Sequence, residues 1–329
     1  MQLTKELLLE PAFDDKKRSG VIQILESISK HDGLANRDSV ESEFDKFPEM
    51  LLDLGLVKKV AIPEGTSYEI TETGLRFLEE YQQIRSLGPE IEPGRVLARI
   101  TKEKVSVIIP TFNEAESIGE IVTNIPSGWE VVLVDLSTDG TAQKARSLRP
   151  DIRIIRRGPR EVGKGAAIRL GLREARGAII VMMDGDGSHQ ASELVKLVFM
   201  LEAQNADMVQ ASRMLRANGS DEMSPHKHPV RYFGNKMITS LINAVFRSSL
   251  TDSQYGFRAF RKEFISKLSL ISNDWDIETE IVVRATKCRG KIVEVPSIEL
   301  QRNNGHSNLV VLDFIKVAGR RLLLEVFRR

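Results

Sequence analysis

The sequence predicts an α/β protein, built mainly on a parallel sheet flanked by helices and preceded by a second, smaller domain. From Val105 onward, short apolar runs rich in β-branched residues alternate with segments of helical periodicity, the pattern of repeated βαβ units. Two of these runs stop abruptly at aspartates, in VVLVDLSTDGT (Val131–Thr141) and IIVMMDGDGSHQ (Ile179–Gln190). Open parallel sheets bind ligands in a crevice at the carboxyl ends of their strands, so we expect these carboxylates to face such a crevice.

The same alternation predicts the order of elements in the larger part. Strands are expected at Val105–Pro110, Val131–Leu136, Ile152–Arg156, Ile179–Met183 and Met208–Ser212. Helices are expected at Ala115–Asn124, Thr141–Leu148, Gly165–Ala175 and Ser192–Glu202. Right-handed crossovers between them give a mostly parallel sheet. No G-x-G-x-x-G follows the first strand, which argues against an ordinary dinucleotide-binding domain.

Length and charge indicate two domains. A chain of 329 residues, 41% hydrophobic, is long enough for two cores. Residues 1–90 hold 11 Lys and Arg against 18 Asp and Glu, whereas the remainder holds 36 against 28 and suits anionic ligands. Glycines and prolines interrupt the pattern between Ser86 and Ile100. We therefore expect a first domain over 1–88, a linker over 89–103, a larger domain over 104–308 and an amphipathic helix over 309–329.

The first domain resembles a winged helix-turn-helix domain. Helical patterns cover Ser19–Lys30, Val40–Leu54 and Thr71–Ile84, and the apolar runs of Val57–Thr71 flank Pro-Glu-Gly, a hairpin signal. The segment expected to supply a recognition helix is acidic, which opposes contact with phosphates. Its charges are Glu41, Glu43, Asp45, Glu49 and Asp53 against Lys46. We therefore expect a docking or dimerising module, with a homo-oligomer possible, rather than a nucleic-acid-binding domain.

Successive motifs of the larger domain resemble family-2 glycosyltransferases with the GT-A fold. They are VSVIIPTFNEAESI, VDLSTDGT, GKGAAIRLGLREARG and MDGDGSH. DSQYGFRAFRKE (Asp252–Glu263) and EVPSIELQRNNGHS (Glu294–Ser307) are similar to the polyprenyl-phosphate hexosyltransferase branch, to which dolichol-phosphate mannose synthases belong. The resemblance implies a metal-dependent, inverting hexosyltransferase of glycosylation at the cell envelope. It would move a hexose from GDP-mannose or a UDP-hexose to a polyprenyl (dolichyl) phosphate.

The Asp-Gly-Asp turn after the fourth strand is the candidate metal site. Asp184 and Asp186 can hold a hard cation, Mg²⁺ or Mn²⁺, that also takes oxygens from a diphosphate. The resemblance implies that Asp186 bridges the metal and the diphosphate, that Asp184 lies nearer the ribose and the metal, and that Gly185 is also a nucleotide-sugar contact. It also implies that Asp135 contacts the base or the ribose.

Other candidate donor contacts come from the first strand and from a glycine-flanked lysine. The resemblance implies that Pro110, Phe112 and Glu114 line the base pocket, although Glu114 could equally be a first-turn partner of the helix dipole. Lys164 stands at a helix start between two glycines. It is expected either to approach phosphate closely or to lie in an ordinary basic loop.

A polyprenyl phosphate acceptor is already ionised, so its site needs cations rather than a strong base. The resemblance implies that Arg213, Arg231 and Arg302 grip phosphate, with Arg213 and Arg302 counted as catalytic beside the two metal-binding aspartates. Asn235, one helical turn after Arg231, could donate a further hydrogen bond. Arg258 is expected either to bind phosphate like these arginines or to have a structural role.

The chain departs from the family pattern at several positions. Leu136 replaces the second of two carboxylates, Ser188 replaces a glutamine after the metal motif, and Asn308 replaces a lysine near the phosphate clamp. His189 is expected to be a hydrogen-bonding loop residue, since a hard cation prefers oxygen. Glu278, on a predicted helix, is expected to be either an acid–base residue or part of a salt bridge.

Two helical segments could address a lipid acceptor. Tyr232–Leu250 and Asn308–Arg329 are apolar on one side, and the alternative for both is packing on the sheet or in a dimer. No segment matches a signal peptide or a spanning helix, and the lone Cys288 suits a reducing compartment. We expect a cytoplasmic protein attached peripherally to the cytoplasmic face of a membrane.

Two other functions compete with this one. A related transferase could act on a soluble phosphorylated acceptor such as phosphoglycerate, which the lack of a spanning helix favours and the last two motifs oppose. Alternatively, the larger domain could only sense a sugar nucleotide while the winged helix binds DNA. The acidic recognition segment and the paired Asp184 and Asp186 both oppose such a regulator.

Overall fold

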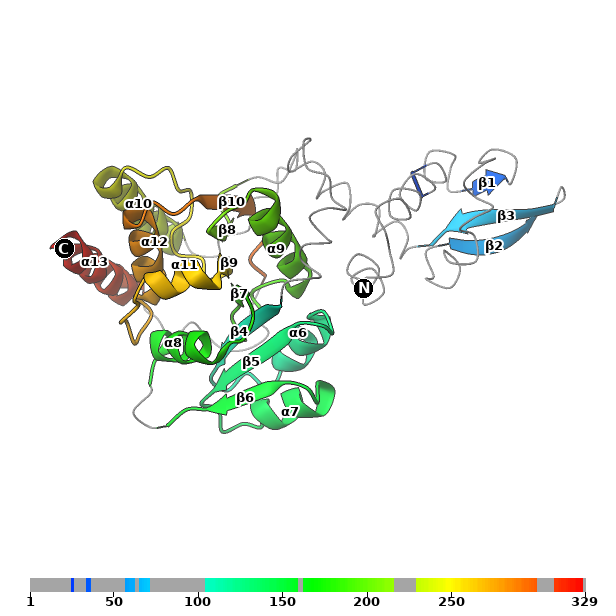
Figure 1. Ribbon diagram of the computed structural model, residues 1–329, viewed down its shortest axis with the longest axis horizontal. Helices are drawn as coiled ribbons and strands as arrows, with labels where there is room; N and C mark the ends of the chain where they lie inside the picture. The colour runs from blue at the N-terminus through cyan, green and yellow to red at the C-terminus, as the bar shows by residue number, and fades with distance from the viewer. Residues whose placement is uncertain are drawn as a thin grey trace. The chain divides into compact units, whose positions relative to one another are not determined.

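The computed structural model describes residues 25–26, 34–36, 57–62, 65–71, 104–158, 162–215, 229–300 and 311–327, the last without its side chains before residue 317. The chain divides into two compact units, Met1–Lys102 and Glu103–Arg329. Figure 1 shows the elements of each unit. The bounds expected for the domains and linker stay predictions.

The described part of the first unit contains a small antiparallel sheet. Its strands are β1 (Leu34–Asn36), β2 (Val57–Ile62) and β3 (Gly65–Ile70), in the order β1-β3-β2. The hairpin predicted over Val57–Thr71 is confirmed, because Val57 pairs with Ile70 and the turn lies between Ile62 and Gly65. Lys58 and Glu69 face each other across it and form an ion pair of 3.0 Å.

The helices expected in this unit fall largely outside the described residues. Within Ser19–Lys30 only Leu25 and Glu26 are described, and both are helical. The segments Val40–Leu54 and Thr71–Ile84 lie outside the described residues, apart from Thr71. The winged helix therefore stays a prediction, as does its acidic recognition segment.

The second unit is built on a seven-stranded sheet. All five predicted strands are present with ends that agree within one residue. They are β4 (Val105–Thr111), β5 (Glu130–Asp135), β6 (Arg153–Arg156), β7 (Ile179–Met182) and β8 (Met208–Ser212). The strand order is β10-β8-β9-β7-β4-β5-β6, and only β9 runs antiparallel to its neighbours. The mostly parallel sheet is confirmed.

Two strands of the sheet were not predicted. They are β9 (Arg258–Arg261) and β10 (Ile292–Pro296). Each carries charge at positions that a buried strand normally fills with apolar residues, which hides it from a search for hydrophobic periodicity. Arg258 is fully buried, and Glu294 accepts hydrogen bonds from the backbone nitrogens of Thr251 (2.8 Å) and Asp252 (3.1 Å).

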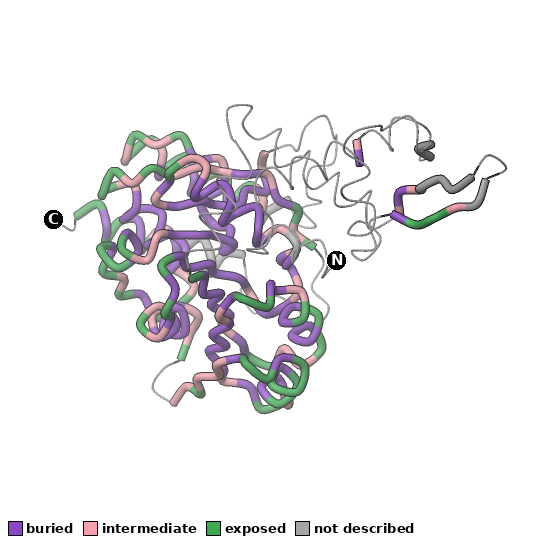
Figure 2. Tube along the Cα trace, turned by 45° about the vertical axis from the view of Figure 1, so that its right-hand side comes forward, coloured by how far each residue is buried: buried purple, intermediate pink, exposed green. Residues whose placement is uncertain are grey.

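Helices cover both faces of the sheet, which runs as a buried band through the unit (Figures 1 and 2). One large apolar cluster joins alternate residues of β4 and β5, such as Ile108 and Val132, to helices of one layer. These helices are α8 (Lys164–Glu174), α10 (Pro229–Phe246), α11 (Lys262–Lys267), α12 (Ile277–Lys287) and α13 (Val311–Phe327).

The other layer buries its apolar residues outside that cluster. It contains α6 (Ile118–Asn124), α7 (Thr141–Leu148), the short 3₁₀ helix η3 (Ala191–Glu193) and α9 (Leu194–Ala203). The intervening residues of the same strands, Val107 and Leu133 among them, are buried on this side. Alternation of side chains along each strand therefore supplies both faces of the core.

One buried arginine holds the chain between α6 and β5. Arg149, at the C-terminal end of α7, is only 7% exposed. Its guanidinium donates hydrogen bonds of 2.7 to 3.2 Å to five backbone carbonyls, those of Val122, Ile125, Pro126, Ser127 and Trp129. These carbonyls are satisfied by this side chain, which stabilises the turn that aligns β5 beside β4.

We predict that Arg149→Met lowers the free energy of unfolding by about 3 kcal/mol, because buried carbonyls lose charge-assisted hydrogen bonds. Urea denaturation of the purified protein measures this loss. Arg146→Met, at an exposed position of the same helix, is the matched control and is expected to change little. Equal losses for the two variants would contradict the role of Arg149.

Candidate active site

The site lies where the carboxyl ends of β4, β5 and β7 meet. Thr111 and Asp135 are register partners at the ends of β4 and β5, and Thr111 Oγ1 donates a hydrogen bond of 2.8 Å to Asp135 Oδ1. The Asp-Gly-Asp turn follows β7, and Ser117 Oγ donates a 2.6 Å hydrogen bond to the carbonyl of Gly185. The parallel sheet therefore brings Asp135 and the turn to one edge, as the sequence predicted.

Gly185 is required by close packing. A Cβ atom at this position would lie 2.7 Å from Thr111 Cγ2 and 3.3 Å from the carbonyl oxygen of Pro110. The turn is therefore pressed against the end of β4. This approach fixes the two aspartates relative to the strand ends, with Asp184 on one side of the glycine and Asp186 on the other.

Asp135 is fully buried and its carboxylate is extensively bonded. Besides Thr111, Oδ1 accepts a 3.1 Å hydrogen bond from the backbone nitrogen of Ser137, and Oδ2 forms an ion pair with Arg156. Asp135 therefore orders the loop after β5. Its predicted contact with the nucleoside stays a prediction.

The loop after β4 is fastened to the loop after β5. The backbone nitrogens of Asn113 and Glu114 donate to Ser137 Oγ (2.8 Å) and Thr141 Oγ1 (2.9 Å). Asn113 has a positive φ of 60°, which turns the chain so that Phe112 stands 54% exposed. Pro110 and Glu114 are half-buried in the same segment, so the three predicted base-pocket residues lie together.

Lys164 lies in the middle of the site. Its Nζ is 2.7 Å from Asp184 Oδ1, 2.9 Å from Glu278 Oε1 and 5.3 Å from the centre of the Trp275 ring. Burial disfavours the charge of this ammonium, but the carboxylates of Asp184 and Glu278 outweigh burial and raise the pKa of Lys164. Lys164 is therefore a charged bridge between two carboxylates rather than part of an ordinary basic loop.

The glycines on both sides of Lys164 pack against the loop after α11. A Cβ at Gly163 would lie 2.1 Å from the carbonyl oxygen of Asn273, and one at Gly165 would lie 2.5 Å from that of Ser272. The backbone nitrogen of Ala166 donates a 3.0 Å hydrogen bond to the same Asn273 carbonyl. The start of α8 is thus held directly on this loop.

Asp186 and the residues after it form a tight, ordered turn. Ser188 donates to Asp186 Oδ1 through its backbone nitrogen (3.0 Å) and its hydroxyl (2.5 Å), and Gly187 has a φ of +81°. Ser188 therefore orients the carboxylate. Asp186 is only 6% exposed.

His189 has the loop role expected from the sequence. Its Nδ1 accepts a 3.0 Å hydrogen bond from the backbone nitrogen of Asp184, and its ring stacks on Phe257 at 4.9 Å and meets the edge of Tyr255 at 4.8 Å. Burial lowers the pKa of this imidazole, which keeps the ring neutral. It packs the turn against the Tyr255–Phe257 segment.

The chemistry of this turn fits a divalent cation. Asp184 and Asp186 offer carboxylate oxygens, the ligands that Mg²⁺ and Mn²⁺ prefer, and the Lys164 ammonium beside Asp184 shows that the position attracts a cation. Among the described residues, no group of three or more His, Cys, Asp or Glu is placed to hold a metal ion. The donor set is therefore a pair of carboxylates, to which a diphosphate could add further oxygens.

Arg213 and Arg258 are both buried and paired. Arg213 binds Asp252 through Nε (2.7 Å) and Nη2 (3.0 Å), lies 3.1 Å from Glu299, and stacks over Tyr255. Burial opposes the charge of its guanidinium, but the two carboxylates raise the pKa of Arg213. A phosphate at Arg213 would share it with these carboxylates, and its catalytic role stays a prediction.

Arg258 takes the structural role among the two alternatives. It is fully buried and binds Glu278 Oε2 (2.5 Å), Gln210 Oε1 (3.0 Å) and the carbonyl of Ser253 (3.0 Å). Glu278 therefore joins Arg258 to Lys164. Its two ion pairs agree with the salt bridge expected for it as one alternative.

The remaining predicted acceptor residues are only partly described. Asn235 is 2% exposed, and its Oδ1 has no hydrogen-bond partner among the described residues. The side chain of Arg231 lies outside the described residues, as do Arg302 and Asn308 entirely. Their phosphate contacts stay predictions.

The network of Lys164, Glu278 and Arg258 was not predicted as a unit. One sequence feature related to this network is Gly256, next to Tyr255. A Cβ at Gly256 would lie 2.8 Å from Glu278 Oε1 and 3.0 Å from Lys164 Nζ, so the network needs glycine there. Glu278 was expected to form a salt bridge as one alternative, but nothing in the sequence indicated that its partners would be Lys164 and Arg258.

A sheet of this topology, with paired aspartates after β7 and further polar groups at the ends of β4 and β5, defines a GT-A nucleotide-diphospho-sugar transferase. The model of Glycosyl transferase family 2 matches residues 106–269. The chain belongs to glycosyltransferase family 2, and the predicted GT-A fold and hexosyltransferase class are confirmed.

Two curated relatives and one solved structure are similar to this chain. It is 32% identical over 214 residues to a dolichol-phosphate mannosyltransferase of Pyrococcus furiosus, covering 63% of this chain and 59% of that one. It is 29% identical over 220 residues to an undecaprenyl-phosphate mannosyltransferase of Micrococcus luteus, covering 63% of this chain and 87% of that one.

The solved structure is glucosyl-3-phosphoglycerate synthase from Mycobacterium tuberculosis, in complex with Mn²⁺, UDP and phosphoglyceric acid. Its TM-score is 0.55 at 20% sequence identity, over 72% of this chain and 83% of that one. This likeness shows the fold alone.

We predict that Lys164→Met lowers the free energy of unfolding by about 3 kcal/mol, because Asp184 and Glu278 would lose their shared buried cation. Urea denaturation without added metal measures the change. Lys267→Met, at an exposed position of α11, controls for loss of a lysine. A Lys164→Met protein as stable as wild type would contradict the bridge.

Proposed function

We propose that this enzyme transfers a hexose from a nucleoside diphosphate donor, GDP-mannose or a UDP-hexose, to a polyprenyl phosphate. The observation that carries the proposal is the Asp-Gly-Asp turn, packed on the end of β4 beside Asp135 and bridged by Lys164. Similarity to two relatives named as polyprenyl-phosphate mannosyltransferases supports the acceptor class.

The donor site consists of the β4 and β5 ends and the Asp-Gly-Asp turn. Phe112, with Pro110 and Glu114, would line the base, and Asp135 would order the loop that meets the nucleoside. Asp184 and Asp186 would hold Mg²⁺ or Mn²⁺, which neutralises charge on the diphosphate leaving group. The Lys164 ammonium, already beside Asp184, would add positive charge at the same place.

The acceptor site would lie on the side of Arg213 and Asn235. A phosphate monoester is ionised at neutral pH, so the acceptor oxygen needs alignment by cations and hydrogen-bond donors, not deprotonation by a base. Arg213, Arg231 and Arg302 are the candidate cations, and Asn235 is a candidate donor. Glu278 is occupied by two ion pairs, which argues against its service as a base.

Transfer would invert the anomeric carbon. The acceptor oxygen attacks the face opposite the nucleotide, the bond to the diphosphate breaks, and the leaving electrons stay on the diphosphate. An α-linked donor then gives a β-linked polyprenyl-phosphate sugar. The cation would lie on the donor side at Asp184 and Asp186, and Arg213, Arg231 and Arg302 would lie on the acceptor side, which would suit two anionic reactants.

Transfer assays with the purified full chain test the proposal. Radiolabelled GDP-mannose, UDP-glucose and other GDP- and UDP-hexoses would be offered with Mg²⁺, Mn²⁺ or EDTA. The acceptors would be a short polyprenyl phosphate, 3-phosphoglycerate, or none. Metal-dependent product on the lipid would support the proposal, and product on phosphoglycerate alone would overturn the acceptor class. Donor binding without transfer to either acceptor, together with a low-salt gel shift of DNA, would favour the regulator instead.

We predict that Asp186→Asn lowers kcat/KM for transfer about a thousandfold, because loss of a metal-binding carboxylate removes several kcal/mol of charge stabilisation. Asp151→Asn is the matched control, because Asp151 is exposed and lies near the amino end of β6, away from the carboxyl ends of the strands. Circular dichroism checks that both variants fold. Unchanged turnover by a folded Asp186→Asn protein would refute the metal assignment.

A further inference from the structure

Helix α10 is apolar on both sides. Its inner side buries Ile238 and Ile242 in the core. Its outer side exposes four large apolar residues spaced four apart, which places them in one stripe along the helix. They are Phe233, Met237, Leu241 and Val245, between 47% and 72% exposed. Isolated exposed apolar residues are ordinary, but a stripe of four on one helix indicates a binding surface.

Helix α13 presents a second group of exposed apolar residues. Its inner side buries Ala318 and Leu322, and it packs against α10 and α12. Its outer side exposes Leu323, Leu324, Val326 and Phe327, between 41% and 82%. We call these residues, with the four of α10, the apolar outer face.

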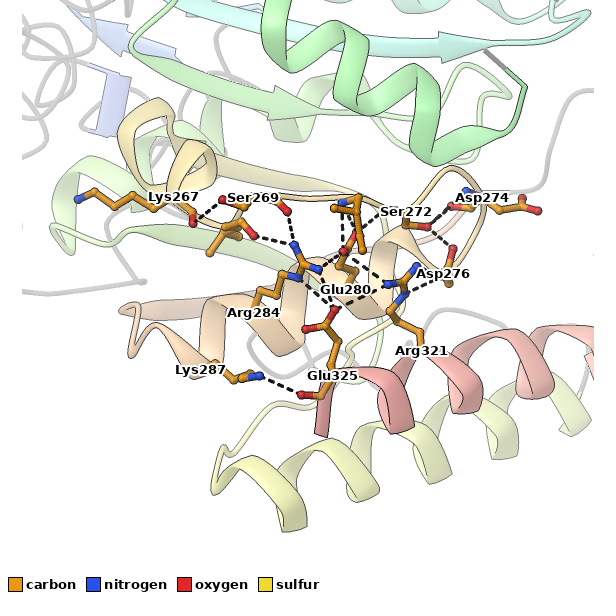
Figure 3. A network of polar contacts seen from close by, with 12 residues as sticks. Lys267, Ser269, Ser272, Asp274, Asp276, Glu280, Arg284, Lys287, Arg321 and Glu325 are labelled. Carbon is orange, nitrogen blue, oxygen red and sulfur yellow. Dashed lines mark hydrogen bonds and ion pairs between the residues drawn. The ribbon is translucent and has the colours of Figure 1, made fainter. Parts of the chain in front are cut away.

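A buried ion network holds α13 in place (Figure 3). Glu325 is 2.8 Å from Arg284, and Arg321 is 2.6 Å from Asp276. Arg284 also lies 2.6 Å from Glu280 within α12. The contacts cross between α12 and α13, so the exposed residues of α13 are presented by an anchored helix.

Among the residues of α10 and α13 whose side chains are described, and at Arg247 just after α10, the exposed charges are positive. The sequence of α10, PVRYFGNKMITSLINAVF, contains no Asp or Glu. Lys236, Arg247 and Arg320 are exposed, whereas Glu325 is buried in the ion network. An apolar surface with cations and few anions is complementary to the surface of an anionic bilayer.

The inner side of α10 borders the candidate acceptor site. Asn235 and Thr239 are buried, and Thr239 Oγ1 lies 2.8 Å from Ser253 Oγ. Ser253 follows Asp252, the carboxylate that binds Arg213. One helix therefore contacts the acceptor side of the site with its inner side and carries the apolar stripe on its outer side.

We infer that the apolar outer face rests on the surface of a bilayer containing anionic lipids. The inference rests on the proposed function, since a lipid-linked acceptor phosphate lies at such a surface. Among the described residues no helix is both long and apolar enough to cross a membrane, which suits attachment in the interface. A second copy of the chain is the alternative occupant, and it is an outcome of the test.

Flotation of the full-length protein with vesicles tests the inference without substrate. Vesicles of phosphatidylcholine alone, or with 30% phosphatidylglycerol, would be mixed with wild type and with the double variant Phe233→Ser/Met237→Ser. We expect wild type to float with anionic vesicles and the double variant to bind them at least about thirtyfold more weakly. Leu148→Ser, on α7 and as exposed as Met237, is the control and should float like wild type.

Two further measurements separate the possible failures. Transfer to a short, water-soluble prenyl phosphate should be the same in wild type and the double variant, which also shows that the variant folds. If transfer is intact but the double variant still floats like wild type, the inference is wrong and the proposed function stands. If wild type floats through this face but transfers to no prenyl phosphate, the proposed function fails. Light scattering that shows a dimer broken by the double variant, with no vesicle binding by wild type, would assign the face to a second copy.

Discussion

The ion pairs of Lys164 are the interaction on which the rest of the site depends. A parallel sheet brings acidic side chains from several strands to one edge, and their mutual repulsion grows as water is excluded. Lys164 offsets this repulsion by forming ion pairs with both Asp184 and Glu278. Arg156 forms an ion pair with Asp135, and Arg213 forms one with Asp252. Specific cations thus hold the carboxylates of the site in place.

The same ion pairs connect the proposed donor side to the proposed acceptor side. From Asp184 the contacts pass through Lys164 to Glu278, then to Arg258, and from Arg258 to the carbonyl of Ser253. Ser253 in turn meets Thr239 of α10. Each step is short, and the steps beyond Lys164 are buried, so a displacement at the Asp-Gly-Asp turn has a direct mechanical route to α10.

Hydrophobic periodicity within short segments predicted much of this fold. Most of what it missed depends on contacts between residues that are far apart in the sequence. The five strands that follow hydrophobic periodicity, and the aspartates at their ends, were predicted because that signal lies within a few residues. β9 and β10 were missed because they carry charges, at the buried Arg258 and the half-buried Glu294, that are satisfied by partners from other elements. Lys164 and Glu278 are separated by more than a hundred residues, and nothing in either segment indicates that they meet. Arg302 and Arg231 were predicted from motifs, and their side chains lie outside the described residues.

The glycines beside Lys164 have a consequence for how ligand binding at the Asp-Gly-Asp turn could be detected. Gly163 and Gly165 bring the start of α8, which carries the Lys164 ammonium, into direct contact with the loop at Ser272–Asn273. Trp275, at the end of the loop, faces the same ammonium. A ligand that moves Asp184 away from Lys164 would therefore change the surroundings of the Trp275 ring, and indole fluorescence would then follow ligand binding at the Asp-Gly-Asp turn.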